Sequence, residues 1–567
     1  MYRQRALFQI RYSVLGICVL LTVCTNCTHL PKVLVKTTKG LVQGRLLEGW
    51  AGHRTGKGYA FQGIPFARPP IGNLRFQRPV EHRSWSGVLH ATHYKSGCAT
   101  VGTDLTVSTA VVGSEDCLYI NVFTPDFSKK QLYPVMVFIY GGAFLIGSAS
   151  DVPEMSIITN FVQRGIVFVN FNYRVGVLGF FTTNSTKYPA NNGLMDQVKA
   201  LEWVRKEIAN FGGDPNRVTL MGQSAGAASV SLHAYSPLSR GLFQQAIMMS
   251  GTAYSPFAID GTDYHHHQSE TAASAMCNVT KNEWRREHVR NYKLRHCLYE
   301  LSWQQIVNNS REAIVTVAGF GFWFPIVDGW LIPNFPAKSQ LHGPPKPVII
   351  GTTKSEFVLM YLMDIASGRL ELSNFTETFV EQEALRKGVA TTKEFGRKGA
   401  PVVQQLIRSV YKQSMNPTGS TVFHAEDCFF LFFQGFNGEE MVMNKTDAHV
   451  SNEFTKTFTD FAKFSNPTPD VSGSVKWDSI TAEKSAQYLS INYPSKMAST
   501  PYHPVSDIIW DGFIADMKKH MYIDAEIKHF TKKELSASMP PMAMVFIVFI
   551  VLLFMVVLAF LARAVCT

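Results

Sequence analysis

RVTLMGQSAG, residues 217–226, is the stretch that decides the fold class of this sequence. Residues 217–222 have the length and β-branched content of a strand that is buried on both faces. Residues 222–226, GQSAG, follow directly, and the alanine-rich residues after them can open a helix. A serine on such a sharp strand–turn–helix junction projects clear of the sheet, where a base and a carbonyl group can both reach it. The segment therefore predicts Ser224 as a nucleophile.

Other apolar runs of similar length occur along the chain. Those with the character of strands buried on both faces are residues 134–140 (PVMVFIY), 166–172 (IVFVNFN) and 348–351 (VIIG). Between them, residues 197–209 carry the apolar stripe of an amphipathic helix, made by Val198, Leu201, Val204 and Ile208. This alternation predicts an α/β fold with a mostly parallel central sheet that helices cover on both faces. No linker or repeat divides residues 29–519, so we expect one domain.

The segment Tyr140-Gly141-Gly142 follows one of the expected strands. Negative charge that develops on a carbonyl oxygen needs fixed N–H donors. The backbone N–H groups of Gly141 and Gly142, with that of Ala225 just after the serine, could converge on one oxygen. We therefore expect an oxyanion hole made by Gly141, Gly142 and Ala225. An ordinary glycine turn is the alternative interpretation.

The composition is that of an ordinary folded protein. The chain has 567 residues, 46% hydrophobic and 17% charged, which excludes a disordered, collagenous or coiled-coil chain. The formal net charge is +11, but no stripe of Lys and Arg indicates a nucleic-acid partner. We expect no cofactor and no metal. The run His265-His266-His267 indicates an exposed loop, because adjacent residues point in different directions and no acidic or cysteine partner has ligand spacing.

Both ends of the chain are apolar. Residues 13–23 (SVLGICVLLTV) are too short to cross a hydrocarbon layer of ~30 Å, so we expect residues 1–28 to be a signal peptide. Residues 542–562 carry no charge and reach ~31 Å as a helix, enough to span. We expect one transmembrane helix there, between a juxtamembrane stalk at 520–541 and a short cytosolic tail at 563–567. A removed lipid-anchor signal and a buried core helix are the alternatives.

A cleaved leader and one C-terminal span predict a body in the lumen of the secretory pathway or outside the cell. Cysteine usage agrees, because disulfides Cys98–Cys117 and Cys277–Cys297 would close short loops that an oxidising compartment permits. Buried free thiols are the alternative. Acceptor triplets for N-glycosylation begin at Asn184, Asn278, Asn308, Asn374 and Asn444, and also at Asn26 if it survives cleavage.

Further motifs are spread along most of the chain. They are FQGIPFARPP at 61–70, LRF at 74–76, EDCLYINV at 115–122, NYR at 172–174, NGLMDQ at 192–197, FGGDP at 211–215, SPLSRGLF at 236–243, VDG at 327–329 and FAK at 461–463. With GQSAG, these motifs resemble the carboxylesterase type B and cholinesterase family of α/β-hydrolases. The resemblance runs from about residue 32 to about residue 515 and implies the α/β-hydrolase fold.

By this resemblance Ser224 is the nucleophile of an ester hydrolase. The family's acid is a glutamate shortly after a strand, and GTTKSE at 351–356 is similar to that segment, which makes Glu356 the acid. The family's histidine lies in a stretch similar to FHAEDC at 423–428, which makes His424 the base. His424 would take the serine proton, while Glu356 would orient the imidazole and stabilise its cation. Alternatives for the base are His449, His503 and the run His265 to His267.

The sequence departs from the family at three points. Glu356 and His424 are 68 residues apart, shorter than the usual interval, and the buried strand that precedes the histidine in relatives is not found: residues 401–411 indicate a helix and 412–420 a loop. Gln223 stands where many relatives carry glutamate. The loop between Cys98 and Cys117 holds no tryptophan, whereas cholinesterases use one there to bind quaternary ammonium. Acetylcholine is therefore not the expected substrate.

The expected function is that of a membrane-tethered serine hydrolase that cleaves small carboxylic esters through an acyl-enzyme. We expect it in the secretory pathway, at the plasma membrane or the endoplasmic reticulum, with a lumenal or extracellular catalytic domain. The main alternative is a cholinesterase-like adhesion or scaffold protein with impaired catalysis, because the segment between Glu356 and His424 is short. A lipase with a lipid-facing lid is a third interpretation.

Overall fold

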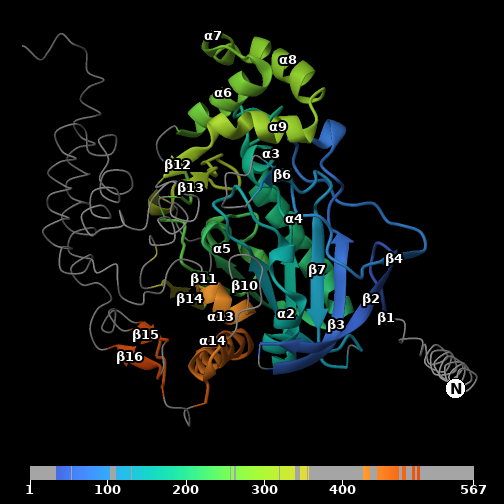
Figure 1. Cartoon of the computed structure of the whole chain (residues 1–567), viewed down its shortest axis with the longest axis vertical. Helices are drawn as coiled ribbons and strands as arrows, with labels where there is room; N and C mark the ends of the chain where they lie inside the picture. The colour runs from blue at the N-terminus through green and yellow to red at the C-terminus, as the bar shows by residue number, and fades with distance from the viewer. Residues whose placement is uncertain are drawn as a thin grey trace, which may run out of the picture. The chain divides into compact units, whose positions relative to one another are not determined.

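The computed structural model describes most of the chain between residues 33 and 498 (Figure 1). Within this range it leaves out residues 53, 103–109, 129, 256, 261–263, 318–319, 339–344, 354–355, 357–425, 434–442, 471–474, 481–487 and 492–493. All described residues belong to one compact unit, Met1–Val389 with Gln413–Ser499. The predicted signal peptide, stalk, span and tail lie outside the described residues, as do His424, His503, Asn374 and the segments 401–411 and 412–420.

A ten-stranded sheet forms the centre of the described residues. Its strand order is β1 (Val33–Lys36), β2 (Leu41–Ala51), β3 (Arg54–Pro65), β7 (Tyr119–Thr124), β9 (Val167–Phe171), β8 (Tyr133–Ile139), β10 (Gly213–Gln223), β11 (Gln245–Met249) and β14 (Val348–Gly351), and β4 (Val88–His90) pairs with β2. Neighbours from β1 to β9 are antiparallel, and neighbours from β9 to β14 are parallel. The β2–β4 pair is parallel as well, so the sheet is mixed: the predicted parallel part is present, and an antiparallel part that the sequence did not predict adjoins it. Only two residues separate β2 from β3 in the sequence, and so short a connection permits only antiparallel pairing.

The strands beside the nucleophile are buried on both faces. Residues 135–139 and all of β9 are at most 3% exposed, and Val218 to Met221 on β10 are fully buried. Consecutive side chains of a strand point to opposite faces, so burial of every position means that both faces are covered. The predicted strands at 134–140, 166–172 and 217–222 are thus confirmed.

Strand β14 confirms the prediction at 348–351 in type but not in burial. Val348 is 42% exposed and Ile350 61% exposed, so the expectation of burial on both faces is wrong. Within the described residues β14 is the last strand of the sheet and pairs only with β11. An end position of this kind leaves an apolar strand partly uncovered, and an apolar sequence does not reveal its position in the sheet.

Helices pack against this sheet. Helix α2 (Glu154–Asn160) lies on β2 and β3, α5 (Ala225–Tyr235) on β10 and β11, and α14 (Lys445–Phe464) on β8 and β10. The predicted amphipathic helix is α4 (Asn192–Glu207); it begins earlier than expected, and its stripe residues Val198, Leu201 and Val204 are buried. The other helices are α3 (Gly176–Phe180), α6 (Tyr264–Cys277), α7 (Lys281–Trp284), α8 (Glu287–Leu298), α9 (Trp303–Asn309) and α13 (Glu426–Phe432).

Helices α6 to α9 lie beyond one end of the central sheet (Figure 1). Three small two-stranded sheets complete the described elements: β5 (Thr100–Val101) with β6 (Val111–Val112), β12 (Val315–Val317) with β13 (Phe320–Phe322), and β15 (Tyr488–Ser490) with β16 (Lys496–Ala498). Of the helices that the structure describes, none combines the length and the apolar character that crossing a bilayer requires.

Candidate active site

Ser224 occupies the turn between β10 and α5. Its backbone has φ +56° and ψ −124°, a conformation that costs a residue with a side chain free energy and that clusters at functional sites. Its N–H donates to the Met249 carbonyl at 2.8 Å, and its carbonyl accepts from the Ala228 N–H at 2.9 Å. These bonds hold the strained turn between β11 and the first turn of α5. The serine is half-buried between the buried residues Gln223 and Ala225.

The glycines on either side of Ser224 leave no room for a side chain. A Cβ atom on Gly222 would lie 2.4 Å from the Gly226 carbonyl oxygen, and a Cβ on Gly226 would lie 2.0 Å from the Ile139 carbonyl oxygen. Gly251, after β11, is similarly confined, because its Cβ would lie 2.4 Å from the Ser224 carbonyl oxygen. The packing of the turn against its neighbouring strands therefore requires the G-x-S-x-G spacing.

The Gly141-Gly142 segment approaches the serine from the end of β8. A Cβ on Gly141 would lie 3.0 Å from the Ser224 Cβ, so the two backbones pass close to each other. Tyr140, just before the glycines, is locked to Tyr173: each hydroxyl donates to the other's carbonyl oxygen, at 3.1 and 3.0 Å, and the rings stack at 4.5 Å. This pairing fixes the direction in which the chain leaves β8. Local sequence patterns do not predict this pairing, because the two tyrosines lie on different segments.

The loop after Tyr140 is bound through its carbonyl groups. The Gly142 oxygen accepts from Leu145 at 2.9 Å and Ile146 at 3.0 Å, and the Ala143 oxygen accepts from Trp323 at 3.3 Å. Within the described residues, the backbone N–H groups of Gly141, Gly142 and Ala225 have no hydrogen-bond acceptor. The same is true of the N–H of Ala143, a residue the sequence analysis did not include; its φ is +56°. A rigid loop with uncommitted N–H groups next to a serine is able to receive an oxyanion.

Glu356 lies past the end of β14, at the same edge of the sheet as Ser224. The register aligns Gln223 with Met249 and Met249 with Gly351, so β10, β11 and β14 end level. One oxygen of the Glu356 carboxylate, Oε1, accepts from the Thr353 N–H at 2.7 Å and from the Thr352 hydroxyl. Parallel strands are about 4.8 Å apart, so β10 and β14 are separated by about 10 Å. Strand β11 lies between them.

His424 lies outside the described residues. Helix α13, which begins two positions later at Glu426, is described and firmly packed. The Phe432 ring contacts those of Phe138 and Phe168 on β8 and β9, at centroid distances of 5.1 and 6.2 Å. Asn160 also donates to the Leu431 carbonyl at 2.7 Å. The end of α13, seven to eight residues after His424, is therefore packed against β8, the strand that precedes the glycine loop, and against β9.

Of the alternative bases, only His449 has a side chain within the described residues. His449 is exposed on α14. His265 to His267 belong to α6, so the predicted loop there is a helix; their side chains lie outside the description, as does His503.

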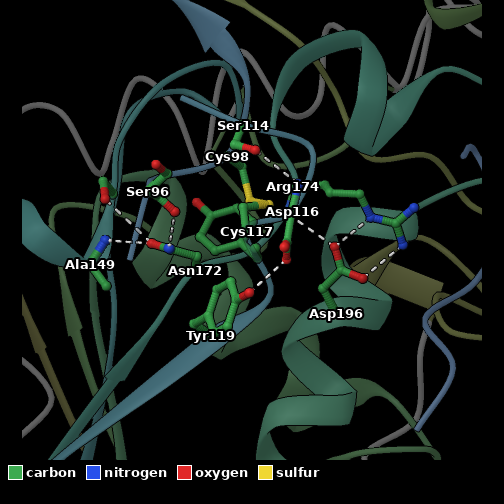
Figure 2. The surroundings of a disulfide bond; sticks show 12 residues. Ser96, Cys98, Ser114, Asp116, Cys117, Tyr119, Ala149, Asn172, Arg174 and Asp196 are labelled. Atoms are coloured by element: carbon green, nitrogen blue, oxygen red, sulfur yellow. Dashed lines mark hydrogen bonds and ion pairs between the residues drawn. A yellow bond between two sulfur atoms is a disulfide. The ribbon is translucent and has the colours of Figure 1, made fainter. Parts of the chain in front are cut away.

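Two ion pairs join motif residues that are distant in sequence, and Figure 2 shows one of them, Arg174 with Asp196, near the Cys98–Cys117 disulfide. Arg174 binds both carboxylate oxygens of Asp196, each at 2.7 Å, and Arg75 binds both of Glu115 at 2.6 and 2.7 Å. Figure 2 also shows the Asn172 side chain between Ser96 and Ala149. It accepts from the Ala149 N–H and donates to the Ser96 carbonyl oxygen. The ion pairs thus join the motif at 74–76 to that at 115–122, and the motif at 172–174 to that at 192–197.

The structure contains both predicted disulfides. Cys98 is joined to Cys117, and Cys277, at the end of α6, is joined to Cys297 on α8. Cys428 is the free thiol within the described residues, and burial raises its pKa well above the usual value. Of the predicted glycosylation sites, the described ones are exposed: Asn184, Asn278, Asn308 and Asn444.

The strand–serine–helix turn on a mixed, helix-covered sheet defines the α/β-hydrolase class. A model of the carboxylesterase family matches residues 31–415 and 388–508, and the chain belongs to this family. It is thus a carboxylic ester hydrolase.

Several curated relatives are named as esterases or hydrolases. The chain is 29% identical over 497 residues to esterase cest-33 of Caenorhabditis elegans, an alignment that covers 78% of this chain and 88% of the relative. It is 31% identical over 497 residues to acylcarnitine hydrolase of Rattus norvegicus, covering 76% and 83%. It is 39% identical over 313 residues to pyrethroid hydrolase Ces2a of Mus musculus, covering 53% and 52%.

Proposed function

We propose that this protein hydrolyses carboxylic esters through a Ser224–His424–Glu356 triad and a covalent acyl-enzyme. The observation that carries the proposal is the strained turn at Ser224, confined by Gly222 and Gly226 and level with the strand end that precedes Glu356. Strain of this kind persists only where the surrounding structure imposes it. A serine held in this way beside uncommitted N–H groups suits nucleophilic attack on a carbonyl group.

The reaction proceeds in two halves. His424 takes the proton of the Ser224 hydroxyl as the oxygen attacks the ester carbonyl carbon. The oxyanion that forms accepts hydrogen bonds from the N–H groups of Gly141, Gly142 and Ala225. When the intermediate collapses, the alcohol leaves with the proton from His424. Water, deprotonated by His424, then attacks the acyl-enzyme, and the carboxylic acid and free serine are released.

We propose neutral esters as the substrate class. Gln223, which is 5% exposed beside the nucleophile, places an uncharged amide where many family members have a carboxylate. Without that charge, and without a tryptophan between Cys98 and Cys117, the site offers little attraction to quaternary ammonium groups. The relatives are named for different substrates: acylcarnitine, pyrethroid and juvenile hormone.

We also propose that the protein is secreted, glycosylated and tethered. The division into a signal peptide at 1–28, a catalytic body at 29–519, a stalk at 520–541 and a span at 542–562 rests on the sequence pattern. Two disulfides within the body fit an oxidising compartment.

The proposed triad is tested by ester hydrolysis with three variants of the secreted body. We expect the wild type to hydrolyse a short-chain nitrophenyl ester, and Ser224→Ala and His424→Ala to lower kcat by at least about a thousandfold. His449→Ala is the matched control and should retain wild-type kcat. Full activity in His424→Ala, or loss in His449→Ala, would reject the assignment of the base. A folded wild type with no activity would favour the adhesion or scaffold role.

A further inference from the structure

A chain of buried polar side chains runs behind the nucleophile turn. In order of contact it consists of Ser239 in the loop after α5, His233 on α5, Gln197 on α4 and Ser229, again on α5. All four are at most 1% exposed. Buried polar groups are usually paired, and here each contacts the next at hydrogen-bond distance. The chain ends at the carbonyl oxygen of Ala225, the residue directly after the nucleophile.

The hydrogen bonds along this chain of side chains all run in one direction, from Ser239 towards Ala225. Burial lowers the pKa of His233 to about 3, so the imidazole is neutral and carries one N–H. The Gln197 Oε1 atom, 2.8 Å from Nε2, only accepts, and this places the proton on Nε2. The other ring nitrogen, Nδ1, then accepts from the Ser239 hydroxyl at 2.9 Å. That hydroxyl also lies 3.2 Å from the carbonyl oxygen of His233.

The second half of the chain reaches α5 from the side of α4. The Gln197 amide nitrogen donates to the Ser229 hydroxyl at 3.2 Å, and that hydroxyl donates to the Ala225 carbonyl oxygen at 2.9 Å. Bonds in such a chain polarise one another, so each is strengthened by the rest. A serine alone can bond to the carbonyl four residues earlier. Here a glutamine from another helix fixes its orientation.

The Ala225 carbonyl and the Ala225 N–H belong to the two peptide planes that flank one Cα. Holding the carbonyl restricts the rotation of this residue and therefore the direction of its N–H. The preceding plane is held as well, because the Ser224 carbonyl accepts from Ala228 at 2.9 Å. The first turn of α5 is thus fixed on both sides of the proposed oxyanion donor.

We propose that Gln197, Ser229 and His233 are positioning residues, which act through Ala225 to aim its N–H at the oxyanion. This inference rests on the proposed function, because it assigns Ala225 a catalytic donor. A role in stability alone would make the same contacts. The two roles differ in what a substitution changes. Loss of the N–H orientation alters kcat and the binding of a transition-state analogue, whereas loss of stabilising contacts alters the melting temperature.

The test compares Ser229→Ala, Gln197→Met and the double variant in the full chain. We expect each single variant to lower kcat about tenfold with KM within about twofold, and to weaken a trifluoromethyl ketone inhibitor by the same factor. The double variant should be no slower than the worse single variant, because both break one chain. Ser231→Ala, which removes a buried hydroxyl from the same helix outside the chain, is the matched control and should keep wild-type kcat.

Wild-type kcat in folded Ser229→Ala and Gln197→Met would overturn the positioning role, as would losses that multiply in the double variant. If Ser229→Ala does not fold, Gln197→Met, which keeps the side-chain length, carries the test. Ser224→Ala separates this proposal from the proposed function. If Ser224→Ala keeps the activity, both proposals fail. If it is inactive while the chain variants remain fast, only the positioning role fails.

Discussion

At the scale of single residues, the site depends on a serine whose backbone conformation is unfavourable by itself. Ser224 keeps its positive φ because Met249 and Ala228 hold it on both sides. Gly226 makes this possible by letting α5 approach the carbonyl oxygen of Ile139. The strain, the close approach and the uncommitted N–H groups are therefore parts of one arrangement.

Gly226→Ala tests that arrangement. The added Cβ would lie 2.0 Å from the Ile139 oxygen, so the turn or the strand has to shift. We expect the free energy of unfolding to fall by about 2 kcal/mol or more, with esterase activity lost. Gly241→Ala is the control, since a Cβ there meets nothing within 4 Å. Thermal unfolding of the pair measures the effect, and equal melting temperatures would contradict the account.

Gln223→Glu tests whether this position affects the base. The side chain lies under the glycine loop, since a Cβ on Gly141 would be 2.8 Å from Gln223 Oε1. A carboxylate there would favour the cationic form of an imidazole that acts as the base beside Ser224. The acid limb of the pH profile of kcat/KM should therefore move to higher pH. Gln245→Glu, at the other end of β11, should leave the profile in place; a shift in both variants would indicate a general charge effect.

At the scale of helices and strands, the buried imidazole of His233 stabilises α5. Its pKa of about 3 in the folded state lies below the ordinary value near 6.5, so the unfolded state binds the proton more readily. The stability this neutral group contributes is fully present above pH 6.5. It is lost as the pH falls from about 6.5 towards about 3.

His233→Gln should therefore flatten the acid side of the stability curve. Between pH 6 and pH 4 the wild type should lose up to about 1.4 kcal/mol per pH unit through this one group, and the variant should lose that much less. Melting temperatures across this range provide the measurement. His288→Gln, an exposed histidine on α8, is the matched control and should follow the wild type. Parallel curves for His233→Gln and the wild type would contradict the buried, neutral imidazole.

Local sequence was enough to predict the elements around the serine. The buried strands at 134–140 and 166–172 and the glycine turn at Ser224 follow from residue types and short spacings. The Tyr140–Tyr173 pair and the chain through Gln197 do not, because they join segments that only the tertiary fold brings together. Exposure of Ile350 on β14 was missed for a similar reason: strand order in the sheet is a long-range property.

At the scale of the whole molecule, family membership and two disulfides agree with a secreted hydrolase, and the tether is a prediction from sequence. Residues 542–562 lie outside the described residues, so the span needs its own experiment. We expect the full chain to remain in the membrane pellet after alkaline carbonate extraction, and a chain that ends at residue 541 to appear in the medium. Release of the full chain by carbonate would contradict the span, and release by a phosphatidylinositol-specific phospholipase would favour the lipid-anchor alternative.

The most direct test of the central claim is covalent labelling of the folded protein with a fluorophosphonate probe, with the adduct located by mass spectrometry. Such probes react with a serine that a neighbouring imidazole activates. If Ser224 is the nucleophile, we expect one adduct, on the peptide that contains Ser224, and no labelling of Ser224→Ala. Folded wild-type protein without an adduct, or with the adduct on another serine, would contradict it.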